Sequence, residues 1–198
     1  RFYENRPSAP VYFEIKRRMN NAILKQRASV RREAVDRVLS GQFPEPNELA
    51  STDPRHVAGM HRFLEFLSEL RARPVAHIAY QREAWMSPHD NSVRVTLDRE
   101  VLFEPDTTSR LETGMTDPLL VFGRRVILEL KFTGRFPDWW RDLVRVFDLQ
   151  QSSAAKYADG ITLFGEARFL DVLRWAGPPG GAPPAPPGNT PASDVALA

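Results

Sequence analysis

Several short segments of this chain alternate between charged and apolar residues, and this period of two limits the possible folds more than any other feature. In a β-strand, residues two apart lie on the same face, so alternation produces one charged face and one apolar face. Asn20 and Asn21 lie between the first two segments and predict a hairpin turn there. The segments predicted to be strands are 11–19, 22–28, 75–86, 93–98, 100–104 and 124–132.

The charged faces of these strands are rich in arginine and lysine. Only four of the 27 basic residues are lysines, and three of those four lie on these faces. A lysine in so arginine-rich a chain is there either by neutral drift or because a compact ammonium group is needed at that place. The residues of the charged faces are Tyr12, Glu14, Lys16 and Arg18, then Lys25 and Arg27, then Tyr80 and Arg82, then Arg94, Thr96 and Asp98, and finally Arg125, Glu129 and Lys131.

Two architectures explain this pattern. In the first, an ordinary antiparallel sheet turns its polar face to water. In the second, the sheet closes into a β-barrel or tunnel with the charges inside and helices packed on its apolar outer side. Solvent-facing sides usually mix Ser, Thr, Gln, Glu and Lys, whereas these faces carry Arg and Lys with isolated acids, which favours the second. The predicted fold class is therefore α+β, a largely antiparallel tunnel with a charged interior, flanked by helices.

Helical periodicity accounts for most of the remaining chain. The segments with apolar residues at helical spacing are 31–39, which is predicted to end at Gly41, and then 55–73, 135–149 and 165–175. Beyond them, residues 177–198 contain seven of the seventeen prolines and a single charged residue. Such a composition cannot bury enough apolar surface to offset the entropy of ordering the chain. We therefore expect one domain over 1–176 and a disordered tail over 177–198.

A tunnel lined with cations requires an anionic occupant, because stacked positive charges in a narrow space repel one another. A phosphate chain supplies negative charge at every unit, which arginine can bind through two parallel hydrogen bonds and lysine through a point charge. Glu129 is an isolated carboxylate among these cations. Its oxygens suit Mg²⁺ or Mn²⁺, hard cations that bridge to phosphates.

A series of motifs resembles a known family. FEIKRR (13–18) with LKQR (24–27), AYQREAW (79–85) followed by VRVTLD (93–98), ILELKF (127–132) and SSAAKY (152–157) occur in the order and spacing of the VTC domain. This domain is the polyphosphate polymerase domain of the triphosphate-tunnel (CYTH-like) superfamily. The resemblance covers about residues 1–160 and implies a phosphotransferase that extends polyphosphate from ATP.

The resemblance also implies roles for individual residues. Those expected to act on the transferred phosphates are Lys16, Arg82, Arg94 and Lys131; those expected to bind substrate are Arg1, Lys25, Arg27 and Lys156; Glu129 is expected to bind Mn²⁺ or Mg²⁺. Lys156 follows the predicted helix and is expected near the tunnel mouth, although an ordinary solvated loop lysine is an equal alternative. The family's domain opens with further strands that this chain lacks before Arg1, so we expect a tunnel that is incomplete on that side.

Other functions use the same charged interior. The tunnel could hydrolyse triphosphate, or hold polyphosphate or another phosphate-rich anion as a sensory module without turnover. Nucleic acid is not an expected partner, because aromatic residues do not interleave with the basic positions. No run of about 20 apolar residues is present, as a membrane-spanning helix would need. The absence of cysteine suits the cytoplasm, where we expect the domain to reside.

Overall fold

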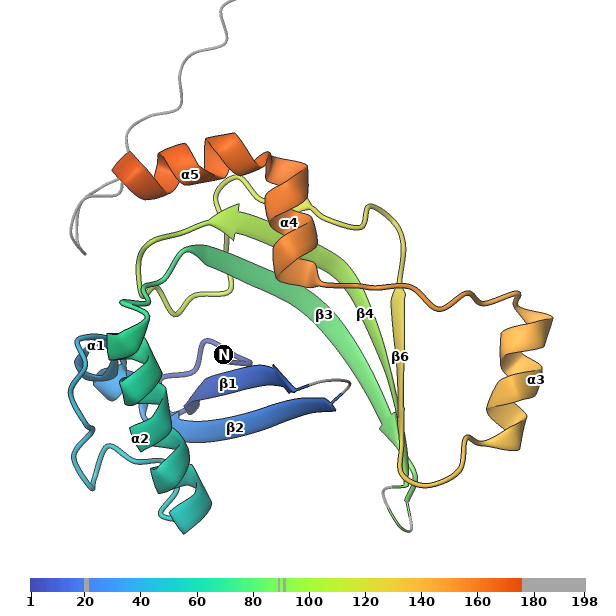
Figure 1. Cartoon of the computed structure of the whole chain (residues 1–198), viewed down its shortest axis with the longest axis horizontal. Helices are drawn as coiled ribbons and strands as arrows, with labels where there is room; N and C mark the ends of the chain where they lie inside the picture. Colours follow the sequence, from blue (N-terminus) through green and yellow to red (C-terminus); the bar gives the residue numbers. More distant parts are fainter. Residues whose placement is uncertain (20–21, 89, 91, 176–198) are drawn as a thin grey trace, which may run out of the picture.

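The computed structural model describes residues 1–19, 22–88, 90 and 92–175. It confirms an α+β protein with antiparallel strands (Figure 1), and these strands form two separate sheets. The predicted hairpin turn at Asn20 and Asn21 and the predicted tail at 177–198 lie outside the described residues.

The smaller sheet is a hairpin of β1 (Val11–Met19) and β2 (Ala22–Val30), paired in continuous register. Its apolar face packs on α2 (Pro54–Glu69), which begins with Asp53 accepting a hydrogen bond of 2.8 Å from the backbone N–H of Arg55. Burial of this face is a main stabilising contribution to this half of the protein. The buried residues of this core are Val11, Phe13, Ala28, Val30, Ala34, Val35, Val38 and Met60.

The larger sheet is arranged around one long central strand. β4 (Val93–Pro105) pairs with β3 (Ala76–Met86) on one side and with β5 (Leu119–Leu120) and β6 (Ile127–Phe132) on the other. All of these pairings are antiparallel. The two strands predicted at 93–98 and 100–104 are therefore one strand.

A bulge in β4 explains why its sequence resembles two strands. Glu100 has a φ of 51°, in the left-handed region that few residues other than glycine adopt. Arg82 pairs with Asp98 and Ile78 pairs with Phe103, so two residues four positions apart in β3 pair with two residues five positions apart in β4. The extra residue places Phe103 on the same face as Asp98.

Two C-terminal helices cover the apolar end of this face. α4 (Lys156–Phe164) lies on Phe103, where a Cβ added at Gly160 would be 2.3 Å from Cδ2 of the ring. The Phe103 ring lies 6.0 Å from that of Phe169 in α5 (Glu166–Trp175). Only glycine allows α4 to approach the sheet this closely, and the approach brings Lys156 to the charged part of the face.

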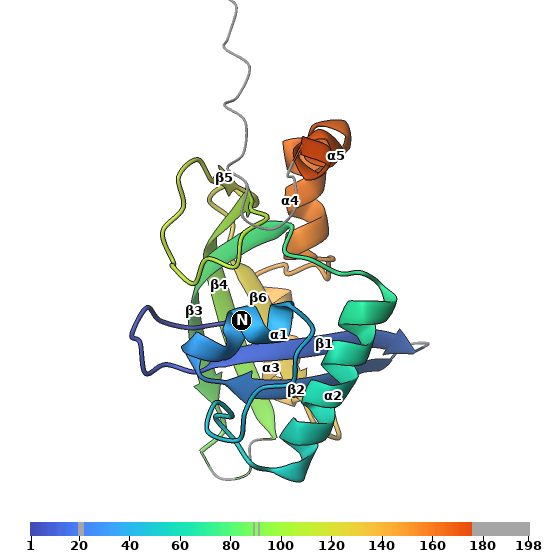
Figure 2. The same ribbon diagram turned by 90° about the vertical axis from the view of Figure 1, so that its left-hand side faces the viewer.

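The two sheets lie one beneath the other. Figure 1 shows the hairpin below the curved sheet of β3, β4 and β6, with α2 against the hairpin and α3 (Asp138–Val146) at the opposite end. Figure 2 shows α4 and α5 on one side of the larger sheet. Within the described residues no strand of the hairpin pairs with the larger sheet, so the predicted closed barrel is not found there and the tunnel is not confirmed.

The predicted helices are largely confirmed, with one omission. The segment 31–39 divides into a 3₁₀ turn (Arg32–Ala34) and α1 (Val35–Leu39), and Gly41 follows with a φ of 88°. The helices predicted at 55–73, 135–149 and 165–175 correspond to α2, α3 and α5. Neither α4 nor the short β5 was predicted. Lys156, for which a solvated loop position was one of two alternatives, is the first residue of α4.

Candidate functional site

One face of the larger sheet brings together four of the predicted site residues. Its central strand supplies Arg94, β3 supplies Arg82, and β6 supplies Glu129 and Lys131. The register on this face pairs Arg82 with Asp98, Thr96 with Glu129, and Arg94 with Lys131. Alternation within each strand therefore concentrates the charges as the sequence predicts.

Asp98 lies at the centre of this charged face and is 1% exposed. Its carboxylate accepts hydrogen bonds of 2.6 and 2.7 Å from Arg82 and lies 2.8 Å from Nζ of Lys156. Burial acts to raise the pKa of the Asp98 carboxyl, but the bonds from Arg82 and Lys156 outweigh it and hold that pKa below its ordinary value. Asp98 is therefore a buried anion stabilised by two cations.

Glu129 lies beside this group and has cationic neighbours of its own. Its oxygens are 3.1 Å from Nζ of Lys131, 3.5 Å from Arg82 and 3.3 Å from the hydroxyl of Thr96. Burial acts to raise the pKa of Glu129, and the hydrogen bond and charge of Lys131 reverse the effect, so the net pKa is lowered. Glu129 is thus ionised and held in place by cations.

Tyr80 joins three cations from different parts of the chain. The guanidinium of Arg82 lies 5.3 Å and the ammonium of Lys156 lies 4.9 Å from the centroid of its ring. Its hydroxyl oxygen accepts a hydrogen bond of 3.1 Å from Arg1. Both ring contacts are within the range of cation–π attraction.

A second charged group lies on the hairpin around Glu14. The Glu14 side chain is 8% exposed and contacts Lys25 at 3.1 Å, Arg27 through a 2.7 Å hydrogen bond from Nε, and Arg1 at 3.7 Å. Burial acts to raise the pKa of Glu14, but hydrogen bonds from Lys25 and Arg27 and the charge of Arg1 lower it to about 2. One carboxylate therefore compensates three cations.

The charged groups of the two sheets face each other. Arg1 contacts Glu14 on the hairpin and Tyr80 on the larger sheet. Burial and the positive charges of Arg1, Lys25 and Lys131 lower the pKa of Lys16, with Glu14 acting in the opposite direction. The charge of Lys131 on β6 is thus among those that act on Lys16 of β1.

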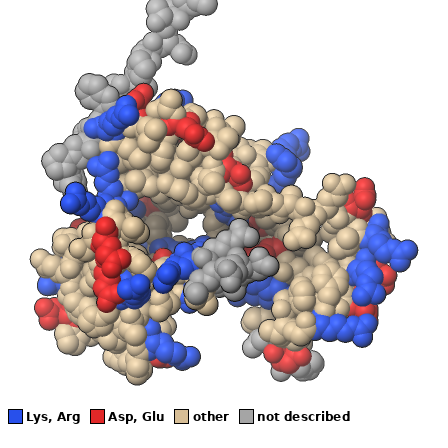
Figure 3. Space-filling view, in the orientation of Figure 1, with Lys and Arg blue, Asp and Glu red and all other residues tan. Residues whose placement is uncertain are grey.

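All nine predicted site residues belong to these two groups, and one expectation about them is corrected. Lys16 lies on the hairpin, so it does not share a single concave sheet with Arg82, Arg94 and Glu129. Figure 3 shows a hollow at the centre of one face of the molecule, with basic atoms at its border. Across both groups, eight predicted cations accompany the carboxylates of Glu14, Asp98 and Glu129.

Lys16 and Arg94 differ from the other cations of the site. Among the residues that the structure describes, neither forms an ion pair with a carboxylate. Both residues are exposed. They are the cations of the site that an incoming anion can contact without breaking an existing ion pair.

Sequence reasoning placed Glu14, Tyr80 and Asp98 on the charged faces without assigning them a function. Their roles depend on contacts between distant segments, such as the 2.8 Å contact of Asp98 with Lys156. One signal was available, because an acid on a face dominated by cations is expected to be an internal counter-ion. The spacing of residues in the sequence could not predict which cations would pair with Glu14 or Asp98.

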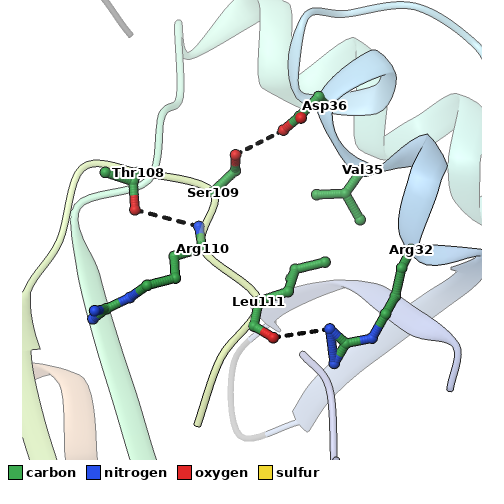
Figure 4. Close-up of a pocket in the computed structure, with 7 residues that line it drawn as sticks. All are labelled: Arg32, Val35, Asp36, Thr108, Ser109, Arg110 and Leu111. Atoms are coloured by element: carbon green, nitrogen blue, oxygen red, sulfur yellow. Dashed lines mark hydrogen bonds between the residues drawn. The ribbon is translucent and has the colours of Figure 1, made fainter. Parts of the chain in front are cut away.

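Two cavities lie beside rather than between the charged faces, and the second of them borders Glu14 and Lys16 of the hairpin. A cavity of about 350 Å³ lies between α1 and the segment Thr108–Leu111 (Figure 4). In it, Ser109 donates a hydrogen bond of 2.7 Å to Asp36 and Arg32 donates one of 2.8 Å to the Leu111 carbonyl, while Nε of Arg32 and Nε of Arg110 are buried without a hydrogen-bond partner among the described residues. A second, mostly apolar cavity of about 390 Å³ separates β1 from the end of α2. We regard the first as the junction between the two halves of the protein.

The expected metal site is limited to one carboxylate. Within the described residues, no three His, Asp or Glu side chains gather as a metal site. Mg²⁺ commonly binds through one or two carboxylates and completes its shell with substrate phosphates and water. Glu129 and the Thr96 hydroxyl supply hard oxygen atoms 3.3 Å apart, which fits a metal held mainly by the substrate.

Comparison with known proteins identifies the family. No helix in the described part of the chain is long and apolar enough to cross a membrane. A search of curated proteins finds no match. The family model described as "VTC domain" matches residues 1–164, which include both charged groups and α4. The chain therefore belongs to the VTC domain family.

Proposed function

We propose that this domain binds a polyphosphate chain between its two charged faces and, with Mg²⁺ or Mn²⁺, transfers the terminal phosphoryl group of ATP to the end of that chain. The observation that supports the proposal is the gathering of eight cations, six from the two facing sheets with Arg1 and Lys156 beside them, against three carboxylates that pair with six of these cations. This excess of positive charge matches a ligand with a negative charge at every unit.

The geometry of the site indicates different roles for its cations. Lys16 and Arg94, without carboxylate partners in the described residues, make the first contacts with phosphate oxygens. Arg82 and Arg27 bind Asp98 and Glu14 through Nε and Nη2, and the remaining N–H donors of their planar guanidinium groups bind phosphate oxygens. Phosphoryl transfer needs positioning and neutralisation of charge more than covalent chemistry, and clustered cations supply both.

Glu129 and phosphate oxygens would together hold the metal, which when bound neutralises charge on the transferred phosphate. Lys131 and Arg82 keep Glu129 ionised and fix its orientation. They also compete with a metal for its oxygens, so the site requires the substrate phosphates as further ligands.

A binding module without turnover is the second candidate. Glu129 already contacts two cations at 3.1 and 3.5 Å, which favours a structural counter-ion over a metal ligand. In that case the domain would hold polyphosphate or a similar anion without consuming ATP. Hydrolysis of triphosphate is the third outcome on the same site.

One experiment separates these functions. The chain is incubated with ATP and Mn²⁺, and both polymer and free phosphate are measured. Polymer supports the proposed transferase, free phosphate without polymer supports a hydrolase, and neither product combined with measurable polyphosphate binding supports the module. The absence of both turnover and polyphosphate binding refutes the proposal.

Variants test whether the identified site binds the anion. Lys16→Ala and Arg94→Ala should each weaken polyphosphate binding and make it less dependent on salt, because fewer counterions are released. Arg145→Ala is the control, since Arg145 is an exposed residue of α3 outside both charged groups. Equal losses for all three variants would indicate diffuse attraction to the surface.

A further inference from the structure

We propose that Asp98 and Tyr80 are positioning residues that hold the Lys156 ammonium group beside Arg82, so that a cation from α4 and a cation from β3 contact a phosphate chain together. The inference rests on the proposed function for its ligand, but not for the position of Lys156. It concerns residues that were given no role by their pattern in the sequence.

Asp98 provides the charge that attracts both cations. It is 1% exposed, while the side chains of Arg82 and Lys156 are 27% and 20% exposed. The two cations would repel each other at such proximity without the carboxylate between them. Because one carboxylate neutralises only one of the two cations, Asp98, Arg82 and Lys156 together carry a net charge of +1, which can attract an anionic ligand.

Tyr80 provides a surface on which both cations rest. Its ring centroid is 5.3 Å from the Arg82 guanidinium and 4.9 Å from Nζ of Lys156. The close packing of Gly160 on Phe103 fixes the start of α4 at this depth. The flexible Lys156 side chain is therefore restricted by its helix, by a carboxylate and by an aromatic face.

The position of Lys156 can be measured without any phosphate ligand. An amine-specific acylating reagent is added in limiting amount, and mass spectrometry gives the rate at which each lysine is modified. Lys131, with a side chain 62% exposed, is the internal reference. Asp98→Asn should raise the rate of Lys156 relative to Lys131 by roughly tenfold, the factor for loss of one charge-assisted hydrogen bond.

A second pair of variants keeps the net charge constant. Tyr80→Leu removes the ring and should accelerate Lys156 modification, while Tyr80→Phe keeps the ring and should leave it unchanged. If Asp98→Asn fails to fold, all lysines react faster and the Tyr80 pair decides the question. An unchanged ratio of Lys156 to Lys131 in folded Asp98→Asn or in Tyr80→Leu would overturn the proposal.

Polyphosphate binding tests the functional consequence. Asp98→Asn removes a negative charge from the site, so simple electrostatics predicts tighter binding. Positioning predicts the opposite, a roughly tenfold weaker affinity and a smaller dependence on salt, because Lys156 and Arg82 no longer act together. Asp142→Asn, which removes the same charge from an exposed position of α3, is the control.

The outcomes separate the two proposals. Folded Asp98→Asn that binds polyphosphate as tightly as the wild type, or more tightly, would overturn the positioning role. A wild-type chain that does not bind polyphosphate would refute the proposed function, and the modification rates of Lys156 would still decide whether Asp98 and Tyr80 fix its position.

Discussion

Replacing Glu14 with glutamine should destabilise the protein in a way that depends on pH. The substitution keeps the shape of the side chain but removes the charge that compensates Arg1, Lys25 and Arg27. Those cations would then repel one another beside Lys16, whose pKa is already lowered by burial and by the charges of Arg1 and Lys25. Removal of one partner from a buried ion cluster leaves the others without compensation.

The magnitude follows from the pKa of Glu14, which is about 2 in the folded protein against an ordinary value of 4.5. At about 1.4 kcal/mol per pKa unit, the ion pairs contribute at most about 3.5 kcal/mol. The side chains of the three cations are 31%, 42% and 29% exposed, so solvent screening reduces this figure. We expect a loss of about 1–2 kcal/mol at pH 7.

The pH dependence has a definite sign. Because folding lowers the pKa of Glu14, its contribution is fully present above pH 4.5 and is lost as the pH falls towards 2. Urea denaturation of wild type and Glu14→Gln at pH 7 and at pH 3 measures the difference in the free energy of unfolding. That difference should be largest at pH 7 and should shrink at pH 3.

The control for Glu14 is an exposed acid with a single partner. Glu65 on α2 pairs with Arg62 at the surface, and Glu65→Gln should change the free energy of unfolding by at most about 0.5 kcal/mol. A difference between wild type and Glu14→Gln that is the same at both pH values would refute the electrostatic reasoning. A stabilised Glu14→Gln variant would refute it as well.

Three further predictions concern other parts of the molecule. Gly160→Ala should lower the melting temperature. Overpacking against Phe103 costs about 1–3 kcal/mol, which outweighs the roughly 1 kcal/mol gained from the higher helix propensity of alanine. An unchanged melting temperature would contradict the close packing of α4 on Phe103. Mn²⁺ should raise the melting temperature of the wild type in the presence of polyphosphate but not that of Glu129→Gln, and equal shifts would exclude Glu129 as the ligand. Deletion of 177–198 should leave melting temperature and polyphosphate affinity unchanged, and a drop in either would show that this segment packs on the domain.

The alternating pattern predicted the charged faces well because it depends on local geometry alone. Any strand places residues two apart on one side, whatever it pairs with. Glu14 and Lys16 on β1, and Glu129 and Lys131 on β6, therefore lie on the predicted charged faces. The same reasoning predicted the apolar face of the hairpin that packs on α2.

Pairing between distant strands could not be predicted in the same way. The sequence was compatible with one closed barrel, yet the described strands form two sheets that are not paired with each other. The bulge at Glu100 is also a tertiary feature, since its φ of 51° is unfavourable for a glutamate outside this context. The bulge places Phe103 and Asp98 on the same face of the larger sheet.

The sequence by itself determined which residues are charged, which strands carry them and which face each one occupies. Only the tertiary structure decided which cation meets which carboxylate. Lys156 illustrates the difference: α4 has weak helical signals and contains Gly160, a poor helix former, so its helix was not predicted. That glycine is needed because α4 packs directly on Phe103, and this packing, which involves residues far apart in the chain, places Lys156 against Asp98.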